Sequence, residues 1–291
     1  MTPLLPAQTL SGVDRIHHAD ALRLLRSLAT GSIDLIVTSP PYDNLRTYNG
    51  YTFPFEAIAH ESYRVLKAGG VLVWVVGDAT VNGSETLTSF RQALYFTDAV
   101  GFRMHDTMIY QKDMTFPETN RYSPCFEYMF VLSKGKPNTF HQLTRPNKYA
   151  GKKISKTQRE KDGSMKIGVG QREGRVFKDE GALPNVWYFS TGYMKVTADK
   201  QAYAHPAMFP EELAERHIKT WSNEGDTVLD YFMGSGTTAK MARNNKRRFI
   251  GCDISLDYVL IARDRLRLPF EKRHTPVNDD VSDLPMFAAS A

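Results

Sequence analysis

Cysteine is scarce in this sequence of 291 residues, which contains only Cys125 and Cys252. Two cysteines cannot hold a metal cluster, and a disulfide is not expected in a reducing compartment. The eight histidines show no metal-ligand spacing, so we expect no metal. No apolar stretch approaches the ~20 residues of a membrane span. The first residues also lack the charged and apolar regions of a signal peptide. We therefore expect a cytoplasmic protein that does not bind a membrane.

A strong charge of either sign is also absent, since the net charge at pH 7 is only +5. This balance permits a polyanionic partner without requiring one. With 42% hydrophobic and 24% charged residues, the composition is that of an ordinary globular protein. The length suits one large domain, or one domain that carries a sizeable insertion.

Predicted strands and helices alternate along the chain. Short apolar runs indicate strands, and apolar residues at helical spacing indicate helices. We expect strands over 16–20, 33–37, 71–76, 103–110, 127–132, 227–231 and 249–254, and helices over 21–28, 55–66, 87–100, 210–221, 237–245 and 255–266. From 133 to 192 the chain is polar and without sustained periodicity. The alternation predicts an α/β fold with a doubly wound, mostly parallel sheet.

A glycine-rich turn follows the predicted strand 227–231 and precedes a helix, in the run Asp230-Tyr231-Phe232-Met233-Gly234-Ser235-Gly236-Thr237-Thr238. Glycines let a backbone approach a ligand closely, and a helix N-terminus offers free N–H groups to an anion. The turn lacks the lysine of a P-loop and the third glycine of the dinucleotide fingerprint. Asp253 ends the next strand, 19 residues after Gly234, where a carboxylate suits a ribose diol. Taken alone, the motif fits an ordinary tight turn equally well.

Two consecutive prolines end the predicted strand 33–37, in the run Val37-Thr38-Ser39-Pro40-Pro41-Tyr42. Neither proline has an N–H with which to continue a strand ladder, so the turn is rigid and its carbonyls have no competing donor. The Ser39 hydroxyl and the Tyr42 ring complete a pocket suited to a planar group that bears an NH₂. A plain Pro-Pro strand end is the alternative, and the glycine turn downstream weighs against it.

Together the two motifs resemble those of the DNA amino-methyltransferases, the N6-adenine and N4-cytosine family, in the permuted order called the β class. Residues 37–42 match the family's catalytic motif and residues 230–238 its cofactor motif, with the target-recognition region between them. The resemblance spans roughly residues 15–132 and 203–266. It implies a Rossmann-like methyltransferase sheet, S-adenosylmethionine as cofactor and double-stranded DNA as partner. Dimerisation is common in such enzymes, and the sequence leaves open both a homodimer and a cognate restriction endonuclease.

The resemblance also divides the chain. It implies a catalytic part over 1–132, a basic target-recognition insertion over 133–202, a cofactor-binding part over 203–268 and an irregular tail over 269–291. Asp20 would bond the adenine amino group of the cofactor, and the run 205–210 would cover the cofactor from the other side. The implied cofactor-binding residues are Asp20, Thr38, Phe209, Asp230, Phe232, Gly234, Ser235, Gly236, Thr237, Thr238 and Asp253.

The catalytic motif indicates how an exocyclic amine can become a nucleophile. The amine lone pair is delocalised into the base, and an acceptor on each N–H frees it. We assign these acceptors to the Ser39 hydroxyl and the Pro40 carbonyl, so that the nitrogen attacks the methyl group in line. The base must first leave the duplex, and Tyr42 would stack on it. The predicted catalytic residues are Ser39, Pro40, Pro41 and Tyr42.

The predicted insertion has a local net charge larger than the +5 of the whole chain. From Arg145 to Lys178 there are eleven basic residues and three acidic ones, a local charge of +8. A solvated charged surface is one interpretation. Beside a base-flipping motif, contact with DNA phosphates is the better one. The residues predicted to make these contacts are Lys148, Lys152, Lys153, Lys156 and Arg159.

Three other functions fit less well. Methylation at cytosine C5 needs a cysteine nucleophile, but Cys125 precedes a strand-like run, and C5 enzymes carry the cofactor motif near the N-terminus. Protein glutamine methyltransferases share a Pro-Pro-Tyr motif but carry the cofactor motif upstream of it. A degenerate methyltransferase that only binds DNA would not need both motifs intact.

The target base depends on Ser39. Adenine-specific relatives typically have Asp or Asn before the two prolines, whereas the serine pattern is associated with cytosine-N4 enzymes. Some enzymes with this serine methylate adenine, and a serine hydroxyl can bond the ring nitrogen beside either amine. Cytosine N4 is therefore favoured, and adenine N6 is the alternative.

Neutralising Lys152, Lys153 and Lys156 together tests the phosphate contacts. The salt slope, which is the fall of the logarithm of the binding constant with the logarithm of salt concentration, should decrease by about 2.7, since each phosphate contact contributes about 0.9. Fluorescence anisotropy with duplex DNA at several salt concentrations measures it, with unchanged cofactor affinity as the control. An unchanged slope would mean that the basic run is only a solvated surface.

Overall fold

The computed structural model describes residues 12–41, 53–113, 119–153, 157–167, 175–205 and 207–268. Its main strands are β1 Arg15–His18, β2 Ile33–Thr38, β3 Leu66–Val76, β6 Arg103–Lys112, β7 Phe126–Ser133, β12 Val186–Phe189, β13 Thr227–Asp230 and β14 Arg248–Asp253. They form one eight-stranded sheet in the order β1-β14-β13-β2-β3-β7-β6-β12. Strand β7 runs antiparallel to both of its neighbours, and the other pairs are parallel. The mostly parallel α/β sheet expected from the sequence is confirmed.

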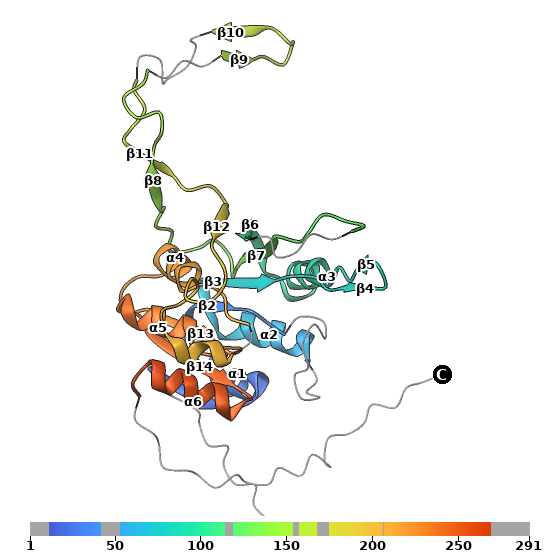
Figure 1. Cartoon of the computed structure of the whole chain (residues 1–291), viewed down its shortest axis with the longest axis vertical. Coiled ribbons are helices and arrows are strands. Elements are labelled where there is room, and N and C mark those ends of the chain that lie inside the picture. Colours follow the sequence, from blue (N-terminus) through green and yellow to red (C-terminus); the bar gives the residue numbers. More distant parts are fainter. Residues whose placement is uncertain are drawn as a thin grey trace, which may run out of the picture.

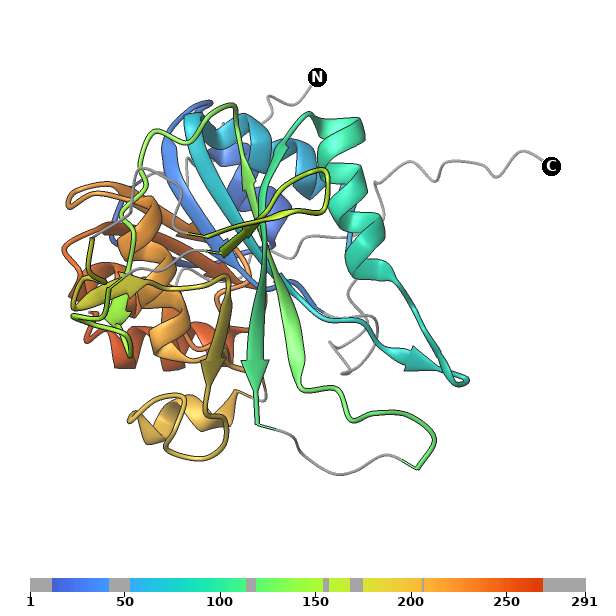
Figure 2. The same cartoon turned by 90° about the horizontal axis from the view of Figure 1, so that it is seen from above.

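Helices cover both faces of this sheet (Figures 1 and 2). One layer contains α4 Glu211–Trp221, α5 Thr237–Asn244 and α6 Leu256–Arg265. The other contains α1 Ala21–Ser27, α2 Phe55–Val65, α3 Thr88–Tyr95 and the π-helical turn η1 Phe96–Val100. The protein therefore has two separate hydrophobic cores, one between the sheet and each helix layer.

Strand β3 shows why the sheet needs both layers. Val71, Val73 and Val75 belong to the core under α4–α6, while Leu72 and Trp74 belong to the core under α1–α3. Successive side chains of a strand point to opposite faces, so a strand covered on both sides is apolar at every position. The continuous apolar run in the sequence is explained by this double burial.

The Gly69-Gly70 pair lies within β3, so the strand begins before the predicted range 71–76. A Cβ on Gly70 would lie 3.0 Å from the Lys67 carbonyl oxygen and 3.1 Å from the Asp34 carbonyl oxygen. Close approach of the backbone therefore favours glycine here, since a Cβ would push these carbonyls away, and the strand continues through it.

The polar stretch 133–192, for which periodicity predicted no element, contains several short strands. Two antiparallel ribbons, β8 Thr144–Pro146 with β11 Glu180–Ala182 and β9 Thr157–Arg159 with β10 Met165–Ile167, belong to an arm that projects far from the sheet (Figure 1). We call residues 144–182 the arm. After it, β12 joins the main sheet beside β6. Strands this short and polar leave no hydrophobic period in a sequence.

Two smaller elements complete the described structure. A hairpin of β4 Thr80–Val81 and β5 Ser84–Glu85 follows β3, and a short 3₁₀ helix, η2 Lys200–Ala204, precedes α4. Within the described residues, no helix is long and apolar enough to span a membrane.

Candidate active site

The carboxyl ends of β1, β14, β13 and β2 meet at one edge of the sheet, because these four adjacent strands are parallel. The segments singled out in the sequence all leave the sheet there: Asp20 after β1, Ser39–Pro41 after β2, the glycine turn after β13, and Asp253 at the end of β14. Ligands of open α/β sheets bind outside the carboxyl ends of the strands. The fold thus gathers the catalytic and cofactor segments at the edge where a ligand is expected.

A buried hydrogen bond joins these two segments. The Thr38 hydroxyl donates to Oδ1 of Asp230 over 2.7 Å, and the Phe232 N–H donates to the same oxygen over 3.1 Å. The Thr238 hydroxyl, in turn, donates to the Val37 carbonyl over 3.2 Å. Thr38, Asp230 and Thr238 are all buried. Their polar groups therefore hold β2 and β13 in register where both strands leave the sheet.

The pKa of the Asp230 carboxyl is shifted by its surroundings. Burial raises its pKa to about 6, although the hydrogen bonds from the Thr38 hydroxyl and the Phe232 N–H, together with the nearby Thr238 hydroxyl, lower it. The carboxylate of Asp253 nearby raises the pKa further. A buried acid with this pKa is ionised at neutral pH only at a cost in folding free energy.

The glycine turn takes a backbone path that favours glycine. Gly234 and Gly236 have φ of +50° and +80°. A Cβ on Gly234 would lie 2.6 Å from Nε2 of His205, and one on Gly236 would lie 2.7 Å from Cβ of Ala262. Ser235, Thr237 and Thr238 are buried. With its side chains turned inward, the turn presents mainly its backbone at the edge of the sheet.

Asp253 and Asp20 both lie on the β14 side of this turn, because β14 and β1 follow β13 in the strand order. The Asp253 carboxylate accepts the Gly234 N–H at 3.0 Å and the Ser255 N–H at 2.8 Å, one on each oxygen, and burial raises its pKa. Asp20 is exposed and caps α1, where its Oδ1 accepts the Leu22 N–H at 2.9 Å and the Arg23 N–H at 3.2 Å. The sequence did not reveal this capping role, although Asp is a preferred cap residue.

The catalytic motif is only partly described. Pro40 is buried, and Ser39 and Pro41 are half-buried at the end of β2. Tyr42 lies outside the described residues. Phe232 is half-buried, with its ring edge-on to that of Phe53 at 5.6 Å between centroids.

The segment before α4 lies over the glycine turn. The His205 ring is close enough to Gly234 to exclude a Cβ, and its centroid is 4.3 Å from that of Tyr258. The His205 Nδ1 accepts the Ala207 N–H at 3.1 Å. Phe209 packs against the core under α4–α6. Pro206 lies outside the described residues.

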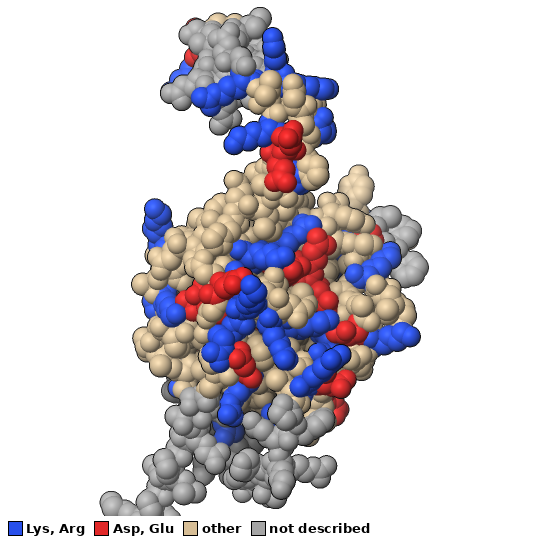
Figure 3. Space-filling view, turned by 90° about the vertical axis from the view of Figure 1, so that its left-hand side faces the viewer, with Lys and Arg blue, Asp and Glu red and all other residues tan. Residues whose placement is uncertain are grey.

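The predicted DNA-binding residues are far from this edge. Lys148, Lys152, Lys153 and Arg159 are exposed on the arm, and Figure 3 shows blue Lys and Arg side chains along it. The ammonium groups of Lys148 and Lys152 lie 4.9 and 5.6 Å from the ring centroid of Tyr149. Lys156 lies outside the described residues.

One polar cluster next to the glycine turn was not foreseen. It consists of Thr197, Asp199, Glu211, Lys240 and Arg265, which come from the segment before α4 and from α4, α5 and α6. In the sequence each of these residues looks like an ordinary surface residue of a helix or loop. Only the fold brings them together.

S-adenosylmethionine, the cofactor expected from the sequence, fits this donor set. A backbone turn without outward side chains can lie against the methionine part of such a molecule. Each oxygen of the Asp253 carboxylate accepts one backbone N–H and has a second lone pair for a ribose hydroxyl. Both N–H groups on Asp20 bond the same oxygen, so the carboxylate keeps capacity for an amino group.

Comparisons with known proteins agree with this arrangement. The family model of the DNA methylases, named for N6 and N4 methylation, matches residues 33–264. An orphan methyltransferase of Bacillus amyloliquefaciens, M.BamHII, is 57% identical over 240 residues, which cover 81% of this chain and 89% of that protein.

Two solved structures share the fold. The cytosine-N4-specific PvuII DNA methyltransferase has a TM-score of 0.61 at 21% identity, covering 86% of this chain and 85% of that one. M1.HpyAVI, solved in complex with S-adenosylmethionine, has a TM-score of 0.55 at 22% identity, covering 87% of this chain and 99% of that one.

Alanine at two left-handed glycines should separate backbone strain from contact with His205. At Gly31 (φ +66°) an added Cβ meets nothing within 4 Å, so Gly31→Ala should cost about 1–2 kcal/mol of stability and leave cofactor affinity unchanged. Gly234→Ala has a similar φ but also collides with His205. It should cost more stability and weaken cofactor binding, and a further His205→Ala change should restore part of the stability. Urea unfolding and calorimetry measure both quantities, and equal effects at the two glycines would contradict the contact.

The raised pKa of Asp230 predicts a pH dependence of stability. Between its ordinary pKa of 3.8 and about 6, the folded protein retains a proton that the unfolded chain has lost. Wild-type stability should therefore fall, through this group, as pH rises from about 4 to about 6. Asp230→Asn can still accept the Thr38 and Phe232 bonds without bearing charge. It should be more stable than wild type at pH 7.5, by on the order of 2 kcal/mol.

Urea unfolding at several pH values measures this effect, with the exposed Asp257→Asn as the matched control. The same slope between pH 4 and 6 in Asp230→Asn and in wild type would show that the carboxyl does not titrate in this range.

Proposed function

This chain belongs to the DNA methylase family and is an S-adenosylmethionine-dependent DNA methyltransferase of the N4-cytosine and N6-adenine type, and we propose that its target is cytosine N4. The choice of cytosine N4 rests on Ser39, which precedes the two prolines and follows the buried end of β2. The fold shared with a cytosine-N4-specific enzyme is in keeping with it. Adenine N6 is the second candidate, because a serine hydroxyl can serve the ring nitrogen of either base.

We propose that residues 39–42 receive the base. The Ser39 hydroxyl and the Pro40 carbonyl accept the two N–H bonds of the amine and free its lone pair. The motif follows a strand that is buried on both faces and tied to β13 by the Thr38–Asp230 bond, so its first residues start from a fixed point. Positioning and electrostatics then carry the catalysis. Tyr42 stacks on the extruded base and offsets part of the few kcal/mol that flipping costs.

We assign the cofactor residues to two groups. The backbone of the Gly234–Thr238 turn, the Phe232 ring, and the carboxylates of Asp20 and Asp253 contact the cofactor, and Phe209 lies in the segment that covers it. Thr38, Asp230 and the buried Thr238 hydroxyl support these contacts from within the fold. When bound, S-adenosylmethionine supplies a methyl group activated by its sulfonium charge.

We propose that the arm contacts the DNA. Its exposed lysines and arginines suit phosphates, and two-stranded ribbons of its kind fit a DNA groove. Within the proposed insertion 133–202, β12 belongs to the main sheet, so the DNA contacts are expected from the arm itself. The name of the relative M.BamHII, an orphan methyltransferase, supports an enzyme that acts without a partner endonuclease. A homodimer stays a proposal.

Analysis of modified nucleosides tests the target. DNA from cells that express the protein is digested and separated by mass spectrometry, with Ser39→Ala as the matched variant. We expect N4-methylcytosine in the wild-type sample and a large loss of it with Ser39→Ala. N6-methyladenine without N4-methylcytosine would overturn the choice of base. Full activity in Ser39→Ala would remove that side chain from the mechanism.

A further inference from the structure

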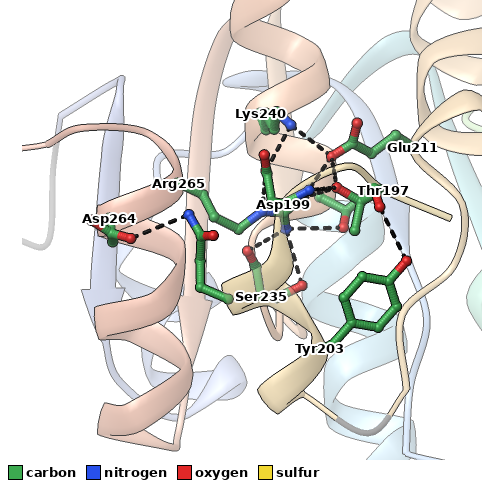
Figure 4. Close-up of polar contacts among 10 residues, drawn as sticks. Thr197, Asp199, Tyr203, Glu211, Ser235, Lys240, Asp264 and Arg265 are labelled. Atoms are coloured by element: carbon green, nitrogen blue, oxygen red, sulfur yellow. Dashed lines mark hydrogen bonds and ion pairs between the residues drawn. The ribbon is translucent and has the colours of Figure 1, made fainter. Parts of the chain in front are cut away.

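A half-buried cluster of two cations and two carboxylates lies between the glycine turn, the helices α5 and α6, and the segment that leads into α4 (Figure 4). Its centre is the Arg265 side chain, which is 0% exposed. A buried guanidinium is costly unless charges and hydrogen bonds compensate it. Its contacts therefore indicate what the arginine does.

Arg265 binds the glycine turn and the segment before α4 at the same time. One terminal nitrogen, Nη1, donates to the Ser235 carbonyl at 2.6 Å and lies 3.0 Å from the Ser235 hydroxyl. The other, Nη2, donates to Oε1 of Glu211 at 2.6 Å, and Nε donates to Oδ2 of Asp199 at 2.9 Å. A guanidinium carries its donors on three separate nitrogens in one plane, so it can bond partners that lie too far apart for the single nitrogen of an ammonium.

The Lys240 side chain binds the same carboxylates but does not bond the turn. Its Nζ lies 2.7 Å from Oδ2 of Asp199 and 2.8 Å from Oε1 of Glu211, the same two atoms that Arg265 binds. Within the described residues, Lys240 makes no hydrogen bond to Ser235. The Thr197 hydroxyl donates to the same Glu211 oxygen at 2.6 Å. Lys240 and Thr197 therefore hold the segment, and among the cluster's charged side chains Arg265 alone also holds the turn.

The segment held by these carboxylates runs across the proposed cofactor site. Asp199 and Glu211 lie at its two ends, and His205, whose ring lies over Gly234, is between them. Tyr203 adds a hydrogen bond from its hydroxyl to the Thr197 carbonyl at 3.1 Å. A movement of Arg265 would thus affect both the turn and the segment above it.

We propose that Arg265 is a positioning residue for S-adenosylmethionine, which fixes the Ser235 turn against the segment 197–211 so that the two sides of the cofactor site keep their spacing. This inference rests on the proposed binding of the cofactor at that turn. Charge-assisted hydrogen bonds to buried partners are about twice as strong as neutral ones, which suits a part that must not shift when a ligand enters or leaves.

The experiment compares Arg265→Lys with Lys240→Gln in the full-length protein. Arg265→Lys keeps the charge of the cluster but loses the reach to Ser235. It should raise the Kd and KM for S-adenosylmethionine about tenfold, the effect of losing one charge-assisted hydrogen bond. The Kd for duplex DNA and kcat should stay within about twofold of wild type. Lys240→Gln should lower the unfolding midpoint at least as much but raise the cofactor Kd by no more than about twofold.

Each outcome decides between positioning and plain stabilisation. Two results overturn the proposal. In the first, the cofactor Kd rises in both variants in proportion to their loss of stability. In the second, the cofactor Kd of Arg265→Lys equals that of wild type, and wild type binds the cofactor. Failure of wild type itself to bind S-adenosylmethionine would instead overturn the proposed function.

A milder variant covers the case in which Arg265→Lys does not fold. Glu211→Gln keeps an acceptor oxygen but weakens the grip of Arg265 and Lys240 on the segment. It should raise the cofactor Kd about threefold, and an unchanged Kd in the folded variant also overturns the proposal.

Discussion

The hydrogen bond between Thr38 and Asp230 joins residues 192 positions apart in the chain, and the whole site depends on it. On one side it fixes the end of β2, from which the Ser-Pro-Pro motif departs. On the other it fixes the end of β13, from which the glycine turn departs. Because both residues are buried, the bond lies in a low-dielectric interior, where a hydrogen bond is electrostatically stronger than in water. An amine and a methyl donor held on these two segments are thereby held relative to each other.

Holding these segments rigidly costs folding free energy. A few residues with buried or partly buried charged groups account for this cost. The Asp230 carboxyl is buried where its ionised form is disfavoured, and Arg265 and Lys240 lie nearby among carboxylates. Buried ionic groups rarely add stability over well-packed apolar ones, but their directional bonds define one arrangement. Here the arrangement concerns the turn, the segment above it and the strand end beside it. These groups lie around the edge of the sheet at which we propose that methyl transfer occurs.

Much of this could be predicted from the sequence, and the rest could not for physical reasons. Strands such as β3 were predictable because burial on both faces leaves an uninterrupted apolar run. The antiparallel direction of β7 and the return of β12 to the sheet were not, since pairing partners leave no trace in a local pattern. Asp253 and the glycine turn were recognisable from spacing. Arg265 was not, because its partners Asp199, Glu211 and Ser235 are distant in the chain.

The arm has both of its ends at one point of the body, where the Leu183 N–H donates to the Leu143 carbonyl at 3.0 Å and β8 pairs with β11. What lies beyond that junction is a closed loop, and doubling the length of such a loop adds only about 0.6 kcal/mol of closure entropy. Evolution can therefore lengthen, shorten or replace the arm without moving the sheet or the edge where the chemistry occurs. With the arm contacting DNA as proposed above, the DNA sequence that such an enzyme recognises can change as a module, while the reaction that it performs stays the same.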